Sequence, residues 1–249
     1  MNALPAGASP SPQSSQTRNF DLSRKDVSRE AALRELNQWL HQDFSAAAPQ
    51  PVRVLHPDGA HSIAVGVDAP LTIDVMGHAG YYVAGMNQQA TITVYGNAGT
   101  GAAENMMSGL VRIKGFASNS AGASAHGGLL VIEGDASLRC GISLKGGDIV
   151  VGGSAGSFTA FMAQAGRIVI CGDAGDALGD SLYEAVIYVR GKVSSLGADA
   201  RFEEMTPVDL VAVHELLQTA GFDHDAADFR KVVSARGLYH WNADANQEY

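Results

Sequence analysis

A glycine recurs every 19 residues through the middle of this 249-residue chain, seven times without a slip. Four and two positions before each of these glycines stands an aliphatic residue, so all fourteen such positions are aliphatic. Self-similarity at a fixed period of this size indicates stacked repeats, in which each unit buries its apolar face against the next. The glycines that carry the period are Gly77, Gly96, Gly115, Gly134, Gly153, Gly172 and Gly191.

The repeat region has the composition of short strands and turns. Of the 29 glycines, 24 lie between Leu71 and Glu203, and none of the eight prolines does. Two aliphatic residues alternate in each unit, as Ile168 and Ile170 do, which is typical of a strand with one buried face. A unit is too short for a propeller blade of about 40 residues and lacks the run of ten or so helix-periodic residues that a helical solenoid needs. We therefore predict an all-β fold, a single-stranded right-handed parallel β-helix of about seven 19-residue coils, roughly 34 Å long at about 4.8 Å per coil.

The flanks do not follow the period, and they divide the chain into four segments. The N-terminal flank is predicted to hold a helix over 26–42, capped by Asp26 or Ser28, with an apolar face of Leu33, Leu36 and Leu40. After it, 52–70 is interpreted as irregular strand that forms an imperfect first coil. The segments are predicted as a mobile tail, a helix with lead-in strands, the β-helix and a C-terminal helical extension, at residues 1–20, 21–70, 71–203 and 204–249.

The C-terminal flank carries clear signals for a second helix. Thr206 is placed to cap its start, Pro207 suits its first turn, and Gly221 is placed to end it. Its predicted apolar face consists of Leu210, Val213 and Leu217. Because a stack of coils has open ends, we expect both flanks to act as caps.

Charge and hydropathy exclude several classes of function. The chain has 17 basic and 26 acidic residues, a net charge of -9, which argues against nucleic-acid or anionic-membrane partners. Its first 25 residues lack the basic and apolar regions of a secretory signal, and no apolar run approaches the roughly 18 residues of a membrane helix. We therefore expect a soluble, cytoplasmic protein.

The usual signatures of catalysis are missing from the sequence. The stretch from Gly146 to Gly156 resembles a phosphate-binding loop, but similar glycines recur in every coil and no helix follows. Cys140 falls in a column of small packing residues and Cys171 in an outward column, and neither has a basic neighbour at motif spacing. The eight histidines are scattered, and acidic residues such as Asp135 are interpreted as turn residues. We predict no catalytic, cofactor-binding or metal-binding residues in this chain.

One outward column is unusual. The residue between the two buried aliphatics is Asp74, Thr93 and Arg112 in the first three coils, but it becomes apolar in the last four. An exposed apolar stripe is normally covered, either by the chain's own C-terminal helix or by another protein. The candidate interface stripe consists of Val131, Val150, Val169 and Tyr188.

The repeat resembles a known family. The pattern in GRIVICGDAG, from Gly166 to Gly175, is similar to the glycine-rich β-helix at the C-terminus of the glutamate synthase large subunit, and a subunit of formylmethanofuran dehydrogenase shares it. The flanking sequences LRELNQWL, RFEEMTPVD and DFRKVVSARGLYHW resemble free-standing chains of the glutamate synthase type. The resemblance is strongest to the small, free-standing β-helix subunit of N-methylglutamate synthase, an enzyme of methylamine assimilation.

This resemblance implies a non-catalytic scaffold subunit of a hetero-oligomer. Its partners would be an amidotransferase-like subunit and an FMN-containing synthase subunit that also carries an iron–sulfur cluster, and this chain itself would hold no cofactor. Two alternatives remain at this point. One is the β-helix subunit of a formyl-transferring complex of the formylmethanofuran dehydrogenase type, and the other is a stand-alone enzyme that binds a small ligand.

Overall fold

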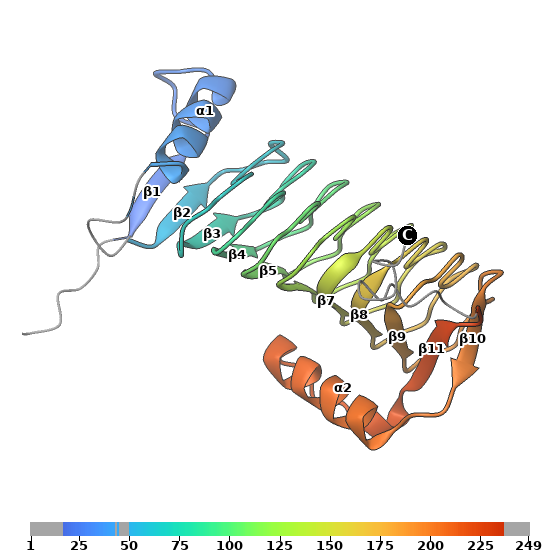
Figure 1. The fold of residues 1–249 in the computed structure, drawn as a ribbon. Coiled ribbons are helices and arrows are strands. Elements are labelled where there is room, and N and C mark those ends of the chain that lie inside the picture. Colours follow the sequence, from blue (N-terminus) through green and yellow to red (C-terminus); the bar gives the residue numbers. More distant parts are fainter. Residues whose placement is uncertain (1–16, 43, 45–49, 237–249) are drawn as a thin grey trace, which may run out of the picture.

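The computed structural model describes residues 17–42, 44 and 50–236, and it is a rod of stacked coils (Figure 1). An eleven-stranded sheet runs the length of the rod in the order β1-β2-β3-β4-β5-β6-β7-β8-β9-β11-β10, parallel from β1 to β9. The parallel strands are β1 (Arg18–Asp21), β2 (Val52–Leu55), β3 (Thr72–Met76), β4 (Thr91–Val94), β5 (Leu110–Ile113), β6 (Leu129–Ile132), β7 (Lys145–Val151), β8 (Ala165–Ile170) and β9 (Val186–Val189).

The predicted parallel β-helix is confirmed by the strand register. From β3 to β9, residues of successive strands pair at a separation of 19, as Ile73 does with Ile92 and Ile149 with Ile168. A second contact column repeats on the other side of the glycine turn, where isolated parallel bridges join alanines of successive coils. On a third side, backbone hydrogen bonds also join successive coils, as from the N–H of Gly122 to the carbonyl oxygen of Ala102. Each coil is therefore hydrogen-bonded to the next on three of its sides. The bridging alanines are Ala79, Ala98, Ala117, Ala136, Ala155 and Ala174.

The interior of the rod is filled by the aliphatic columns that define the period. Both aliphatic residues of each coil are buried, and Cys140 and Leu144 lie in the same core. Because identical positions stack directly above one another, the core is a continuous, closely packed apolar ladder. At about 25 cal/mol per Å² of apolar surface, each buried aliphatic side chain contributes about 1.5–3 kcal/mol, which makes this ladder the main source of stability.

Two glycine columns are required for two different reasons. In the column that sets the period, a Cβ at Gly96 would lie only 2.7 Å from the backbone carbon of Gly77, so neighbouring coils approach too closely for a side chain. In the column just before the strands, Gly109, Gly128 and Gly147 instead adopt positive φ angles of 83°, 80° and 75°, which L-residues with a side chain rarely adopt.

Polar side chains in the turn column next to the period glycine bind the following coil. The backbone N–H of Asn97 donates to Nδ1 of His78 at 2.9 Å, and the N–H of Ser154 donates to Oδ1 of Asp135 at 2.7 Å. Asp173 accepts in the same way from the N–H of Lys192 at 2.7 Å. Asp135 and Asp173 are therefore turn residues, as predicted, and each also accepts a hydrogen bond from a backbone N–H of the next coil.

The N-terminal flank closes the first end of the rod. Helix α1 (Arg29–Leu40) begins at Ser28, whose side chain accepts from the N–H of Ala31, and it buries Leu36 and Leu40 while Leu33 is partly buried. Strand β2 pairs in register with β3, which makes the segment from Val52 a lead-in coil. The predicted tail extends too far, because its last residues belong to β1, which pairs with β2, whereas residues 1–16 lie outside the described part of the chain.

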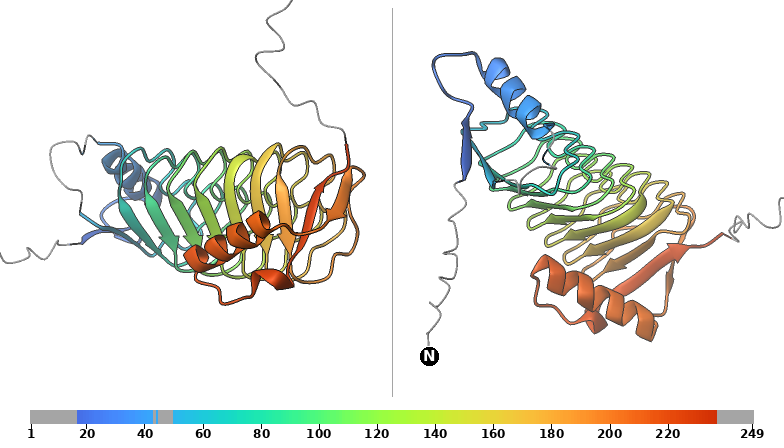
Figure 2. Two further views of the ribbon diagram at one scale, coloured as in Figure 1. Left: turned by 60° about the horizontal axis from the view of Figure 1, so that its bottom comes forward. Right: turned by 60° about the vertical axis from the view of Figure 1, so that its left-hand side comes forward.

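The C-terminal flank is not purely helical, contrary to the prediction for 204–249. After β10 (Ala200–Glu203), it contains α2 (Pro207–Ala220), the short 3-10 helix η1 (Ala226–Asp228) and β11 (Arg230–Ser234). β11 inserts antiparallel between β9 and β10 and supplies hydrogen-bond partners for the open edge that the last coil leaves. Figure 2 shows how this segment folds back along the rod, with α2 lying across the outward face of the sheet.

Coil stacking makes a testable prediction about glycine. Gly96→Ala should lower stability by about 2 kcal/mol or more, because its Cβ meets fixed backbone at 2.7–2.8 Å. Gly85→Ala is the matched control, since its Cβ would lie at an ordinary 3.4 Å from the nearest atom. Urea unfolding of both variants checks this, and equal stabilities would contradict the stacking geometry.

Candidate docking surface around helix α2

Helix α2 covers the apolar stripe on the last coils. Val131, Val150, Val169 and Tyr188 are buried, and they pack against Val213 and neighbouring residues of α2. The stripe is therefore an intramolecular contact, and its predicted role as an exposed interface is corrected in favour of the other alternative, cover by the chain's own helix. Cys171 lies in the outward column as predicted, yet it is also buried under this segment.

The helix is held at its N-terminal end by a buried carboxylate. Asp209 accepts a hydrogen bond from Tyr188 Oη at 2.7 Å and forms an ion pair with Lys231 Nζ at 3.1 Å, and it closes a capping box with Thr206. The predicted apolar face is wrong at one position, because Leu210 is exposed and Asp209 turns inward in its place. The polar contact joins the coil, α2 and β11 in one cluster.

The charge of Asp209 is stabilised where it lies. Burial raises the pKa of its carboxyl group, but hydrogen bonds from Thr206, Tyr188 and Lys231 outweigh burial and hold the pKa at about 2. Burial and the adjacent carboxylate raise the pKa of Tyr188, so this hydroxyl remains a donor. For Lys231, burial lowers the pKa, but its hydrogen bonds to Asp209 and Glu203 raise it overall, so the ion pair persists at neutral pH.

The C-terminal end of α2 is held by Arg112 of β5. Its guanidinium donates to the carbonyl oxygen of Ala220 at 2.9 Å and to that of Thr219 at 3.3 Å, and it pairs with Glu133 at 3.1 Å. A cation at this position satisfies open helix carbonyls and complements the helix dipole. Sequence reasoning missed this role, because the carbonyls come from a segment more than a hundred residues away.

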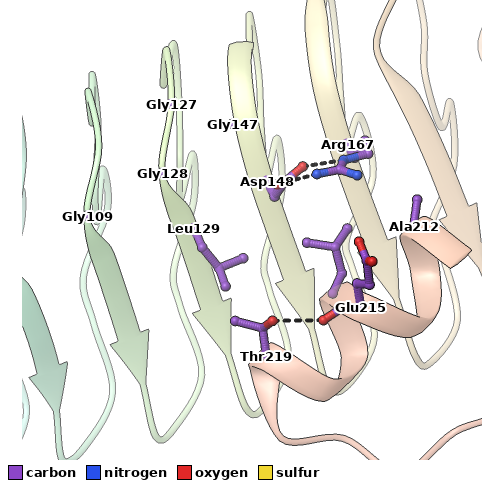
Figure 3. A pocket seen from close by; sticks show the side chains of 11 residues that line it. Gly109, Gly127, Gly128, Leu129, Gly147, Asp148, Arg167, Ala212, Glu215 and Thr219 are labelled. Carbon is purple, nitrogen blue, oxygen red and sulfur yellow. Dashed lines mark hydrogen bonds and ion pairs between the residues drawn. The ribbon is translucent and has the colours of Figure 1, made fainter.

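An open pocket of about 590 Å³ lies beside α2 (Figure 3). Glycines of successive coils form one side, and Ala212, Glu215 and Thr219 of α2 form the other. Asp148 and Arg167 face each other in the pocket through two hydrogen bonds of 2.7 Å each. The glycines that line it are Gly109, Gly127, Gly128 and Gly147.

An ion pair provides most of the polar side-chain atoms of this pocket. The hydrogen bonds that Arg167 donates to Asp148 raise the pKa of its guanidinium, and the two side chains satisfy each other. Among the described lining residues there is no cysteine, histidine or lysine to act as a nucleophile or base near neutral pH. Within the ranges 17–42, 44 and 50–236, no cluster of three or more histidine, cysteine or acidic side chains is placed to bind a metal ion.

The two cysteines are protonated at neutral pH. Burial raises the pKa of the Cys140 thiol to about 12. Burial also raises the pKa of the Cys171 thiol to about 11, although Arg190 opposes this rise. The thiolate is the reactive form of cysteine, so both side chains act as small packing residues.

The outer face of α2 is apolar in its first turns, whereas the exposed residues further along it, His214, Glu215, Gln218 and Thr219, are polar. Val208 is 77% exposed and Val211 is 58% exposed, and Leu210 lies beside them with its side chain also open to solvent. Where a helix carries apolar side chains on both faces, as α2 does in its first turns, both faces are normally covered. The stripe accounts for one face only, and the other is available to a partner. Of the helices in the described ranges, none is long and apolar enough to cross a bilayer.

Comparison with known proteins places the chain near one curated relative. It is 53% identical over 218 residues to Protein GlxC of Rhizobium meliloti strain 1021, an alignment that covers 87% of this chain and 96% of that protein. No family model matches the chain. Together with the stacked coils, this relative fits the β-helix family of the glutamate synthase type that the repeat resembles.

The covered stripe makes a prediction for α2. Val150→Asp should destabilise the protein by about 3 kcal/mol or more, because it places an unpaired carboxylate in a fully buried position. Thr91→Asp, on the uncovered and exposed part of the same sheet, should change stability little. Thermal unfolding together with amide hydrogen exchange in α2 would measure both effects, and similar effects of the two changes would rule out the docked helix.

The ion pair of Asp209 predicts a pH dependence. A pKa lowered from 3.8 to about 2 on folding stabilises the native state above pH 4 by about 2 kcal/mol, at roughly 1.4 kcal/mol per pKa unit, and this contribution fades as the pH falls towards 2. Asp209→Asn should therefore lower the free energy of unfolding at pH 7 and approach the parent protein near pH 2. Urea unfolding at both pH values tests this, with the exposed Asp228→Asn as control. If Asp209→Asn lowered the free energy of unfolding equally at both pH values, the result would contradict this role of the ion pair.

Proposed function

The chain belongs to the GlxC family, and we propose that it acts as a non-catalytic scaffold subunit of a glutamate-synthase-like hetero-oligomer. The resemblance of its repeat and both flanks to that class supports the proposal. The core of the rod is a closed aliphatic ladder, and the open pocket presents a satisfied ion pair. These features suit a rigid body that positions other chains.

The most specific form of the proposal is the β-helix subunit of N-methylglutamate synthase, in methylamine assimilation. Its partners would be an amidotransferase-like subunit and an FMN-containing synthase subunit, with FMN and the iron–sulfur cluster held by the synthase. We propose a cytoplasmic location for this assembly. Rigid coils would keep the two partner sites in fixed relative geometry, which favours transfer of a reactive amine between them.

The outer face of α2 is the observation on which the docking proposal rests. Val208 and Val211 project from a helix that is anchored at both ends, by Asp209 at one end and Arg112 at the other. A pre-ordered apolar face loses little conformational entropy on binding, so it can contribute affinity efficiently. The adjoining pocket offers charged groups at the rim, where they can orient a partner.

Co-purification tests the proposal directly. The full chain, tagged and expressed in its native host, should recover amidotransferase-like and synthase chains identifiable by mass spectrometry, together with the absorption of bound flavin. Recovery with a metal-dependent formyl-transferring complex would instead favour the second family. Recovery alone, combined with stabilisation of the isolated chain by a small ligand, would favour the stand-alone enzyme.

The exposed apolar face of α2 around Val208 and Val211, called here the docking face, gives a separate prediction. Val208→Glu and Val211→Glu together should reduce recovery of the partner chains at least tenfold, because they put charge on a buried apolar contact. The melting temperature should stay within a few degrees, since both side chains are exposed in the free chain. Met107→Glu, at an apolar residue that is 47% exposed and lies outside the helix, is the control. Unchanged recovery would remove α2 as the docking element.

A further inference from the structure

A second side of the rod carries apolar residues that the fold does not require. Where each coil turns back, three positions have left-handed backbone, with φ between 52° and 73° in six successive coils, and the middle position is buried while the other two lie on the outer side of the turn. We call this surface the turn edge. One of its columns consists of Tyr82, Gly101, Ser120, Arg139, Phe158 and Ala177. The other consists of Met86, Asn105, Ser124, Ser143, Met162 and Ser181.

Only the first and the fifth of these six coils carry large apolar residues in both columns. Tyr82 and Met86 lie in the first, Phe158 and Met162 lie in the fifth, and all four side chains are 40–49% exposed. A bulky residue is disfavoured in left-handed backbone, and the other four coils adopt the same turn with glycine, serine, alanine, asparagine or arginine. The large side chains therefore add no evident stability to the turn and leave apolar surface in water.

Each pair sits in a larger apolar cluster. Phe158 packs edge-on against Phe161, with ring centroids 6.1 Å apart, and the exposed Leu138 lies on the preceding coil. At the other end of the turn edge, Tyr82 packs edge-on against Tyr81 at 6.5 Å. None of these residues belongs to the cluster under α2, so both patches are free of that helix.

We propose that the turn edge pairs two copies of this chain in an antiparallel, two-fold symmetric dimer. A two-fold axis that lies between the two copies, perpendicular to the rods and level with the third coil, exchanges the first coil with the fifth and leaves each column facing itself. Tyr82 of one copy then faces Phe158 of the other, and Met86 faces Met162, and both contacts occur twice. The two patches lie four coils apart, about 19 Å at 4.8 Å per coil.

The charges on the turn edge favour this arrangement over a parallel one. Arg139 lies in the fourth coil and Glu104 in the second, so the antiparallel dimer brings them close to each other across the interface. In a parallel dimer, each would lie at the level of its own copy, where no opposite charge meets it. Neither side chain has an ion pair within the described part of the chain, so both are available.

The dimer leaves the proposed docking face accessible. Helix α2 lies against the strand side of the rod, apart from the turn edge, so each copy would present its own α2 outward (Figure 1). At the centre of the dimer, the axis passes between small residues, Ser120 and Ser124, which permit close approach. The inference is independent of the proposed function, because it concerns the isolated chain.

Sedimentation velocity of the full chain from low to high micromolar concentration tests the dimer. The parent should shift from monomer to dimer over this range. The double variant Phe158→Ser and Met162→Ser, which copies the serines of other coils, should remain monomeric with its melting temperature kept or raised. Met107→Ser, exposed but outside both columns of the turn edge, should dimerise like the parent. A parent that stays monomeric throughout, or a double variant that still dimerises, would overturn the proposal.

Two further variants test the geometry. Ser120→Cys should form a disulfide between copies under mild oxidation, since a residue on the axis meets itself and both native cysteines are buried. Ser108→Cys, exposed in another column, should not form this disulfide.

A charge swap tests the register independently. Arg139→Glu should weaken the dimer at least fivefold, and adding Glu104→Arg should restore it. Cross-linking at Ser108 alone, or no restoration by the charge swap, would contradict the antiparallel register.

Discussion

The whole structure depends on the hydrogen-bonded stacking of one coil on the next in a 19-residue register. Three sides of each coil take part, one through the strands, one through the bridging alanines and one through backbone hydrogen bonds where the coil turns back. This stacking requires glycine where backbones nearly touch, aliphatic residues inside, and polar turn side chains that accept from the following coil. Because the ladder is continuous, its stability is a sum over neighbours, and the two ends are its weak points.

The ends are closed in different ways. At the N-terminal end, α1 and β1 cover the lead-in coil with apolar side chains and a parallel strand. At the other end, β11 completes the sheet edge antiparallel, and α2 folds back over the apolar stripe. The C-terminal closure is fixed by charge at two points, Asp209 and Arg112, so the cover has one position and one orientation.

The repeat architecture could be predicted from the sequence because stacking makes each column chemically uniform. Both helices and their caps could be predicted too, since Ser28, Thr206 and Gly221 act locally. Contacts between residues far apart in the chain could not be predicted from the sequence. Periodicity places Leu210 inside, but the tertiary partners Tyr188 and Lys231 draw the carboxylate of Asp209 inward in its place.

The other differences between the prediction and the structure also arise from contacts between distant parts of the chain. Strands β1 and β11 carry weak local patterns, and each forms because an open sheet edge accepts it. The apolar stripe itself is visible in the sequence, but whether a helix or another protein covers it depends on how the chain folds back. Periodicity does show where a residue differs from the others in its column. Phe158 and Met162 differ in this way from the mostly small or polar residues of their columns on the turn edge.

Removal of one whole coil tests the stacking account most directly. Deletion of residues 85–103 joins two equivalent positions of the 19-residue unit and leaves α2, its anchors and the end caps in place. The account predicts a cooperatively folded, shorter rod with a β-type circular dichroism spectrum, whereas deletion of residues 85–94 should abolish folding because it breaks the register. If both deletions unfold the chain, or both leave it folded, the coils are not equivalent stacked units and the account is wrong.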